Sequence, residues 1–451
     1  MADFIKQLSF NDLSPESIEV SKKCLLDALG NGFLGFNTPW ATAVLEFVGE
    51  QRGRREATII NHVERVPSSN AALVNGTMVH SSDFDDVSPP GGHPGAIMIP
   101  TALSIGEKVD VDGKEVILST VIGYEIMNRL IKAIVQSRGF HLTATCGVFA
   151  STATAGRLLQ LTKEQLINAF GIAGSYAAGS LECYVDGSMT KCFHTGKAAH
   201  DGILSAILAQ KGLTGPRSIF EGKYGFLRAY SDITEVERLT HRLGSKPFEI
   251  ESTTFKLHAG CLYTHSALNG ILDLKRENDL GVRDIENVVI GLRKAHYKIC
   301  ADPLPNKYTP VNVLDAQVSL PYLAALVMYY DRPITPKDFD EILIRDPDLL
   351  RLARKVKPVI DPILDQKEWH DKRPANVEIN IVGGRKLQRT IPFPKGDPRD
   401  PLSRPQLEEK FKILAIPVIG EEKTSEIVQI VNKLEMIDNV KGLTKLLRPN
   451  K

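Results

Sequence analysis

The chain lacks the cysteine spacing of a metal centre and the apolar runs of a membrane protein. Its six cysteines are scattered, with no Cys-x-x-Cys pair, so a cysteine-based zinc or iron–sulfur site is not expected and reduced thiols are the simplest interpretation. No apolar run reaches the roughly 18 residues that span a bilayer. The first residues, Met-Ala-Asp-Phe-Ile-Lys-Gln, carry charge and are not typical of a secretory signal. We expect a cytoplasmic protein with no membrane partner.

The chain also lacks a charge excess and a phosphate-binding loop. Its 55 basic and 54 acidic residues leave a net charge of +1, whereas nucleic-acid binders usually carry a basic excess. Gly171-Ile172-Ala173-Gly174 is not followed by the pattern that a dinucleotide site needs. We therefore expect neither a nucleic-acid partner nor a nucleotide cofactor.

What the chain does have is enough length for two domains, since 451 residues exceed one ordinary core. The first half reads as successive helices: Ser14-Pro15 and Asp112-Gly113 are helix starts, and residues 162–165 form a capping box. Beyond about residue 245, residues 288–292 and 377–382 have strand character, and Gly383-Gly384 joins the second run to residues 388–391 as a hairpin. The pattern predicts a mainly α protein. A large all-helical domain comprises residues 1–245 plus 400–451, and a smaller α+β lid domain, residues 246–399, is inserted in it.

Residues 83–94 are the most informative segment for function. Asp83, Asp85 and Asp86 lie within four residues at a predicted helix end, and a loop rich in proline and glycine brings His93 to the start of the next helix. Carboxylates this close cannot all ionise freely, so their pKa values should be pushed apart. Histidine titrates near neutrality and is suited to proton transfer. The segment indicates an acid/base site, and the alternative is an acidic helix end with a structural histidine.

Two further segments combine histidine or lysine with helix starts. His141 precedes a helix rich in small residues, where it would either help to bind an anion or cap the helix. Residues 187–196 read as a polar turn before a helix at Ala198, in which Lys191 and His194 share a face if helical. Lys191 would bind an anion if buried, or would be solvated if exposed.

The region where the character of the chain changes carries a third group. Residues 255–265 hold Lys256, two histidines and Cys261, which is either a nucleophile or, as we favour, a buried structural thiol. Tyr297 follows the strand at residues 288–292, where strand ends commonly present functional side chains.

Together these segments resemble the MmgE/PrpD family, which includes 2-methylcitrate dehydratase, cis-aconitate decarboxylase and iminodisuccinate epimerase. The resemblance covers nearly the whole chain and rests on five ordered matches, at residues 83–94, 139–149, 189–199, 220–227 and 256–261. It implies a helical domain with an inserted lid, a homodimer formed through the helical domain, an active site in the cleft between domains, and no metal or organic cofactor.

The resemblance also implies residue roles. The catalytic positions of the family fall on Asp83, His93, His141 and Tyr297, and its lysines on Lys191 and Lys256; we add His194 and Cys261 as substrate-binding residues. Animal cis-aconitate decarboxylases have threonine where this chain has Val87 and histidine where it has Cys261. The chain also has His200 and Asp201 where arginine and asparagine are common in the family.

The chemistry implied is proton transfer at a carbon next to a carboxylate, with lysines stabilising the developing enediolate. We predict a cofactor-independent lyase acting on a small di- or tricarboxylate, most simply a hydro-lyase of the 2-methylcitrate dehydratase type. Decarboxylation or epimerisation could use the same groups. A polycarboxylate binder without catalysis and a structural dimer scaffold are the alternatives outside enzymes.

Overall fold

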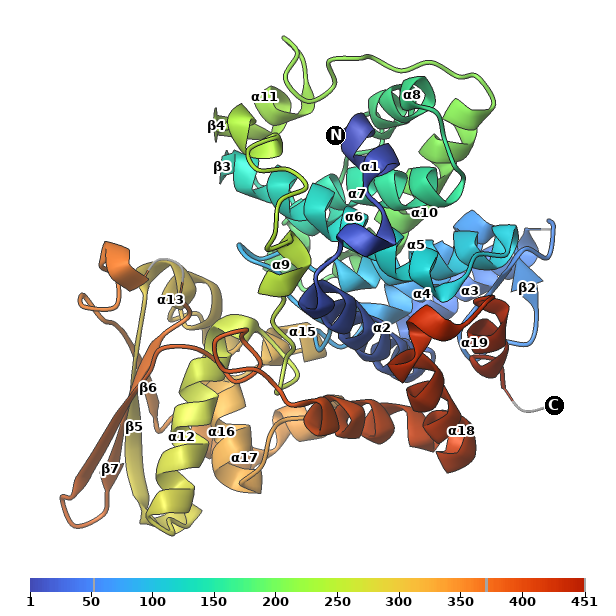
Figure 1. The fold of residues 1–451 in the computed structure, drawn as a ribbon. Coiled ribbons are helices and arrows are strands. Elements are labelled where there is room, and N and C mark those ends of the chain that lie inside the picture. The colour runs from blue at the N-terminus through green and yellow to red at the C-terminus, as the bar shows by residue number, and fades with distance from the viewer. Residues whose placement is uncertain (52, 370–371, 450–451) are drawn as a thin grey trace. The chain divides into compact units, whose positions relative to one another are not determined.

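The computed structural model describes residues 1–51, 53–369 and 372–449, and its contacts divide the chain into two compact units (Figure 1). The first unit comprises Met1–Ser81, Asp85–Thr254 and Ser403–Lys451, and the second comprises Ser82–Phe84 and Phe255–Leu402. The prediction of a mainly α protein is confirmed. Among the described residues, no helix combines the length and apolar character that crossing a membrane requires.

The first unit is built from helices, with two short pairs of strands. Its helices are α1 (Ala2–Gln7), α2 (Pro15–Gly35), α3 (Pro39–Glu50), α4 (Ser68–Val79), α5 (Gly95–Val109), α6 (Gly113–Ala133), α7 (Leu142–Leu158), α8 (Lys163–Ala173), α9 (Cys183–Asp186), α10 (Thr190–Gln210), α11 (Phe226–Tyr230), α18 (Arg404–Asn432) and α19 (Lys441–Leu446). The antiparallel pairs are β1 (Ala57–Thr58) with β2 (Arg65–Val66) and β3 (Ile134–Ser137) with β4 (Ser231–Thr234).

Several helix starts were predicted correctly because side-chain caps are encoded locally. Ser14 accepts a hydrogen bond from the Ser17 amide before Pro15 begins α2, and Asp112 caps α6 in the same way. Thr162 and Gln165 form the expected capping box of α8. These side chains satisfy amide groups that the first helical turn leaves without partners.

Helix α10 is the centre of the first unit, where it packs against α4, α7 and α8. Glycines allow the close approach of α4 and α10. A Cβ added to Gly196 would lie 2.1 Å from the Leu73 carbonyl oxygen, and one added to Gly76 would lie 2.8 Å from the Gly196 Cα. On the α7 side, a Cβ on Gly202 would lie 2.4 Å from the Ser151 side chain. These glycines therefore allow α10 to pack closely against α4 and α7.

The second unit contains a four-stranded mixed sheet in the order β6-β5-β7-β8. Its strands are β5 (Ile285–Leu292), β6 (Val356–Ile360), β7 (Ala375–Ile381) and β8 (Lys386–Ile391), and β6 is parallel to β5 while the other pairs are antiparallel. The predicted hairpin is confirmed, and Gly383 and Gly384 supply the positive φ angles of its turn, 96° and 91°. Helices α12 (His265–Glu277) and α16 (Leu320–Tyr330) pack against this sheet (Figure 1). The remaining helices are α13 (Lys294–Cys300), α14 (Pro305–Tyr308), α15 (Val313–Gln317) and α17 (Pro347–Ala353).

The observed units differ from the expected boundaries at residues 245 and 400. Residues 246–254 belong to the first unit because the turn Glu249–Ser252 packs on α6, where Lys132 pairs with Glu249 at 2.5 Å. The second unit ends at Leu402, and it includes Ser82–Phe84, a short excursion that the sequence did not indicate.

We predict that the substitution Gly196→Ala destabilises the protein by about 1–3 kcal/mol, because its methyl group would overlap the α4 backbone and force the helices apart. Gly49→Ala is the matched control. Gly49 lies in α3 with open space around its Cα, so alanine should be neutral or slightly stabilising there. Urea unfolding measures both variants, and equal stabilities would contradict the tight α4–α10 contact.

Candidate functional site

The loop between α4 and α5 places several polar side chains in the interior. Helix α4 ends at Val79, earlier than the predicted end at Asp83, so the three aspartates lie in the loop. The loop folds back on itself where Ser88 and Gly92 exchange backbone hydrogen bonds of 2.9 and 3.0 Å. A Cβ on Gly92 would lie 2.5 Å from Cδ1 of Ile131 of α6, so a side chain there would require that isoleucine to shift. This reversal brings His93 next to residues at the end of α4.

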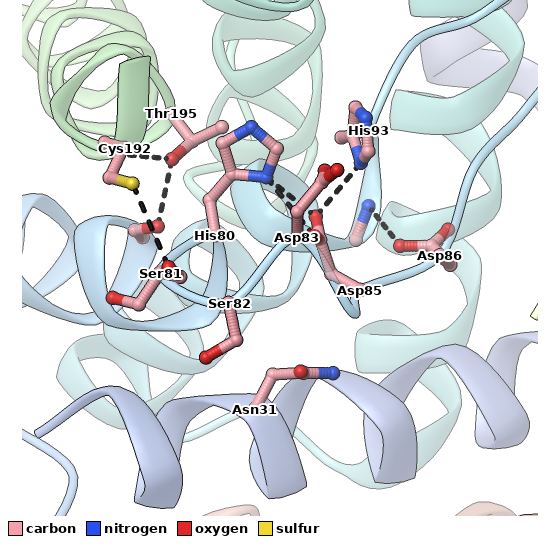
Figure 2. A network of polar contacts seen from close by, with 12 residues as sticks. Asn31, His80, Ser81, Ser82, Asp83, Asp85, Asp86, His93, Cys192 and Thr195 are labelled. Atoms are coloured by element: carbon pink, nitrogen blue, oxygen red, sulfur yellow. Dashed lines mark hydrogen bonds and ion pairs between the residues drawn. The ribbon is translucent and has the colours of Figure 1, made fainter. Parts of the chain in front are cut away.

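Asp85 is the centre of the first group of side chains, which Figure 2 shows from close by. Its Oδ2 lies 2.9 Å from Nδ1 of His80 and 3.1 Å from Nδ1 of His93. The two imidazole rings meet edge to face, with centroids 4.5 Å apart. Asp85 and His80 are fully buried and His93 is 8% exposed. One carboxylate oxygen thus accepts from two imidazoles.

Burial and these hydrogen bonds set the protonation of the group. Burial lowers the pKa of His80 to about 3, although Asp85 acts in the opposite direction. Burial alone would raise the pKa of Asp85, but His80 and His93 hold it well below its usual range. Asp85 is therefore ionised at neutral pH, and His80 is a neutral donor to it.

A second pair of histidines lies close to this group. His141 Nδ1 is 3.1 Å from Nδ1 of His194, and the His141 ring stacks on that of His80 with centroids 6.2 Å apart. The alternative role of His141 as a helix cap is wrong, because its side chain makes no capping hydrogen bond to α7. Burial lowers the pKa of His194 to about 4 and that of His141 well below its usual value.

Lys191 lies with this cluster. Residues 190–196 are the first two turns of α10, so the prediction of a turn there is wrong, and Lys191 and His194 share a helix face. Lys191 is 1% exposed, which contradicts the solvated alternative. Its charge also contributes to the lowered pKa values of His80, His141 and His194.

The prediction that neighbouring aspartates have separated pKa values is confirmed by Asp86. Burial and the charge of Asp27 raise the pKa of Asp86 well above its usual range, whereas that of Asp85 is lowered. Asp86 accepts from the Tyr124 hydroxyl at 2.7 Å and from the Gly95 amide at 3.0 Å. The pKa values of adjacent residues are thus shifted in opposite directions, and Asp86 anchors the start of α5.

In the second unit, Asp83 and Lys256 form a buried ion pair. Lys256 Nζ donates to the Asp83 carboxylate at 3.0 Å and to its carbonyl oxygen at 2.7 Å, and Lys256 is 1% exposed. Asp83 has a left-handed φ of 47°, which is uncommon for a residue with a side chain. The Gly260 amide also donates to the Asp83 carbonyl, at 3.2 Å. The strained residue is therefore held by several hydrogen bonds.

Cys261 and Tyr297 also belong to the second unit. Cys261 is buried, and burial together with the charge of Asp83 raises its pKa to about 11. The favoured interpretation as a protonated, structural thiol is supported, because a nucleophile needs the thiolate. Tyr297 is half-buried on α13. The predicted roles of both residues toward a substrate stay predictions.

His80 was not predicted to be a site residue, and Asp85 was not distinguished from the two neighbouring aspartates. A usable signal was present, since a histidine three residues before an aspartate cluster invites an imidazole–carboxylate pair. His80, Asp85 and His93 also have the types and spacing that a divalent cation accepts, their ligand atoms lying within 4.8 Å of one another. However, both Nδ1 atoms already lie at hydrogen-bond distance from Asp85, which suits a proton-bearing network.

Buried neutral histidines predict a stability that falls below neutral pH. The folded state holds the pKa of His80 far below the ordinary 6.5, so below pH 6.5 the unfolded state binds a proton that the folded state does not. His80 alone should cost about 1.4 kcal/mol of unfolding free energy at pH 5.5. Asp86 acts oppositely, because its raised pKa favours the folded state as pH falls.

The variant His80→Asn isolates this contribution, because asparagine keeps a donor near Asp85 and does not titrate. Denaturant unfolding at pH 7.5 and 5.5 should show a loss of stability about 1.4 kcal/mol smaller in the variant than in the wild type. An equal loss in both proteins would mean that His80 is already protonated in the folded state.

Comparisons with known proteins identify the family of this chain. Models of the MmgE/PrpD N-terminal and C-terminal domains match residues 1–239 and 258–436. Human cis-aconitate decarboxylase is 27% identical over 461 residues, covering 99% of this chain and 93% of that protein. The enzyme of the same name from Aspergillus terreus is 26% identical, covering 98% of this chain and 93% of its own. The 2-methylcitrate dehydratase of Salmonella typhimurium is 24% identical over 444 residues, covering 90% and 87%. Since the two domain models together match most of its length, this chain belongs to the MmgE/PrpD family.

Proposed function

We propose that this protein is a cofactor-independent lyase that acts on a small di- or tricarboxylate by proton transfer at a carbon next to a carboxylate. The observation that carries the proposal is a pair of buried hydrogen-bonded groups, His80–Asp85–His93 and His141–His194, which meet where the His80 and His141 rings stack and which are accompanied by Lys191. Several neutral imidazoles beside a buried cation suit proton transfer to and from an anionic substrate.

The roles follow from charge and protonation. A hydrogen on a carbon next to a carboxylate is weakly acidic, so removing it requires a base and a cation that stabilises the enediolate. His93 and His141 exchange protons with the substrate in this proposal, and Lys191 binds one of its carboxylates. In the second unit, Lys256 also binds a substrate carboxylate, and Asp83 holds that lysine in place.

Independence from cofactors is part of the proposal. Imidazoles and lysines supply the base and the positive charge that this chemistry needs, so no metal is required for the proton to move. Dialysis against EDTA should therefore leave activity unchanged. Loss of activity that zinc or another divalent cation restores would instead make His80, Asp85 and His93 a metal centre.

Dehydration and decarboxylation are the two outcomes that relatives support. Dehydration removes a proton to give a carbanion, from which hydroxide leaves with its electron pair, whereas decarboxylation forms the carbanion by loss of carbon dioxide and then adds a proton to it. The sequence favours dehydration, since Val87 and Cys261 depart from the animal decarboxylases. The relatives favour decarboxylation, because the cis-aconitate decarboxylases cover 98–99% of this chain and the dehydratase covers 90%. Product analysis separates the two.

We predict turnover of 2-methylcitrate or cis-aconitate, followed by proton NMR in deuterated water. A methyl singlet on a double bond in place of the methyl doublet of 2-methylcitrate, or a vinyl signal if the proton leaves from the CH₂ carbon, would establish a dehydratase, and itaconate signals from cis-aconitate a decarboxylase. His93→Gln should lower kcat about 10²–10⁴-fold, because the proton-transferring imidazole is gone. The control is His241→Gln, the same change at an exposed histidine.

Two results would count against the lyase. Absence of turnover with citrate and an aspartate-derived dicarboxylate as well would favour a polycarboxylate binder, which should still be stabilised thermally by its ligand. Full activity of His93→Gln would remove His93 from the mechanism.

We further predict that binding a tricarboxylate such as citrate takes up protons near pH 6.5. The pKa values of His141 and His194 are lowered by burial and then by neighbouring charges, Lys191 among them, so a bound anion must raise them. Calorimetry in two buffers with different ionisation enthalpies measures the uptake, and affinity should increase from pH 7.5 to 6.

Lys191→Met should weaken this binding roughly tenfold to hundredfold, since a hydrogen bond to a charged group is lost. Lys211→Met changes an exposed lysine just after α10 and serves as the control. Proton release on binding, or equal affinities of the two variants, would contradict the assigned electrostatics.

A further inference from the structure

Proton transfer by His93 does not by itself explain why Asp85 also bonds to a second buried histidine, His80. Asp85 and His80 are both fully buried, yet neither belongs to the groups that the proposal assigns to the substrate. Asp85 Oδ2 is shared by two imidazoles, at 2.9 Å from His80 and 3.1 Å from His93. A carboxylate oxygen can accept two hydrogen bonds, and each donor then shares its negative charge with the other.

The hydrogen bonds define which nitrogen of each ring carries a proton. An ionised carboxylate only accepts, so Nδ1 of His80 and Nδ1 of His93 must both be protonated to bond to Asp85. In the neutral rings, the lone pair then lies on Nε2. The Nε2 of His80 is buried and has no hydrogen-bond partner in the described part of the chain, as expected for a bare acceptor.

We propose that Asp85 and His80 are positioning residues for His93: Asp85 fixes its ring and its Nδ1–H tautomer, and His80 competes for the same carboxylate oxygen. This inference rests on the proposed role of His93 as a proton-transferring group. The competition sets how strongly Asp85 increases the basicity of His93 Nε2. A carboxylate bonded to one imidazole alone would make that imidazole a stronger base.

The local structure supports a fixed geometry. His80 is the C-cap residue of α4, where its amide bonds back to the Gly76 carbonyl, so its ring starts from a defined position. The edge-to-face contact of the two rings leaves little room for either to turn. The Ser88–Gly92 reversal fixes the backbone on the other side, just before His93.

Other titratable groups face this trio from neighbouring elements. They are Asp27 on α2, Asp86 in the same loop, His141 at the start of α7, and Lys191 and His194 on α10. Lys410 pairs with Asp27 at 2.7 Å, and burial and the charge of Asp27 raise the pKa of Asp86, which disfavours its negative charge. His141 and His194 are neutral, so Lys191 is the cation whose charge opposes protonation of the trio.

Opposite effects of two substitutions follow from competition for one oxygen. Asp85→Asn removes the negative charge, so His93 should become a weaker base and the acidic limb of kcat/KM should move to lower pH. His80→Leu removes the competing donor, so Asp85 should act on His93 alone and the limb should move to higher pH. His80→Asn places an amide donor near the Nδ1 position and should restore the wild-type limb.

The size of the loss in kcat distinguishes the positioning residues Asp85 and His80 from the proposed base His93. We expect kcat to fall about tenfold to hundredfold in Asp85→Asn, less than in His93→Gln, because the base remains but its orientation is lost. If Asp85 and His80 had only a structural role, every variant would be less stable, but the acidic limb of kcat/KM would not move in opposite directions. Circular dichroism and unfolding curves identify any variant that fails to fold.

The deciding experiment observes His93 directly by NMR of histidine-labelled protein, with its signals assigned by their loss in His93→Gln. The wild type should show the Nδ1–H tautomer, and the titration midpoint of His93 should fall in Asp85→Asn, rise in His80→Leu and stay unchanged in His80→Asn. An Nε2–H tautomer, or midpoints that move together, would overturn the inference.

This measurement needs no substrate, so it separates the two proposals. Turnover of none of the tested acids, with the expected tautomer and opposite shifts, would reject the lyase and retain the positioning pair. Turnover with the wrong tautomer or parallel shifts would retain the lyase and reject the pair.

Discussion

The close contact between α4 and α10 is the constraint on which the cluster in the first unit depends. Gly76 and Gly196 let the two backbones approach to a distance that any side chain would prevent. The contact aligns the end of α4, which carries His80, with the start of α10, which carries Lys191 and His194. Helix α7 packs on the other side of α10 and brings His141 to the same place. Close packing at glycines therefore brings buried histidines and a lysine from three helices together.

Burial then determines what these groups can do. Imidazoles in the interior stay neutral because charging them would cost solvation, and the charge of Lys191 adds to that cost. A neutral imidazole is the form that accepts a proton, so these buried histidines can accept one at a pH where exposed histidine would be partly charged. Two adjacent buried aspartates have opposite pKa shifts, because two imidazoles lower the pKa of Asp85 whereas burial and the charge of Asp27 raise that of Asp86.

Much of this architecture could be predicted because the relevant signals are local. Capping residues marked α2, α6 and α8, and alternation with a glycine pair marked the β7–β8 hairpin. The start of α10 was missed because residues 187–196 are polar and small, and packing on α4 makes seven of them helical despite that composition. The extra stretch Ser82–Phe84 of the second unit was missed for a similar reason, since only tertiary contacts such as Lys256 to Asp83 assign it there. The spacing of His80 from the aspartates was a usable signal, but only the loop reversal shows that Asp85 is its partner.

A single cluster that can serve several reactions explains why family membership does not define the product. Proton removal next to a carboxylate requires a neutral base, a cation for the carboxylate and a means of holding the base in one tautomer. In the proposed mechanism His93, Lys191 and Asp85 supply these properties, and none of the three selects between loss of hydroxide after proton removal and loss of carbon dioxide before protonation. Selection must come from groups that orient the substrate, since the bond that breaks is the one aligned with the adjacent π orbitals. Positions such as Val87, Cys261 and Asp201, where the chain departs from relatives, are therefore where its substrate preference should be sought.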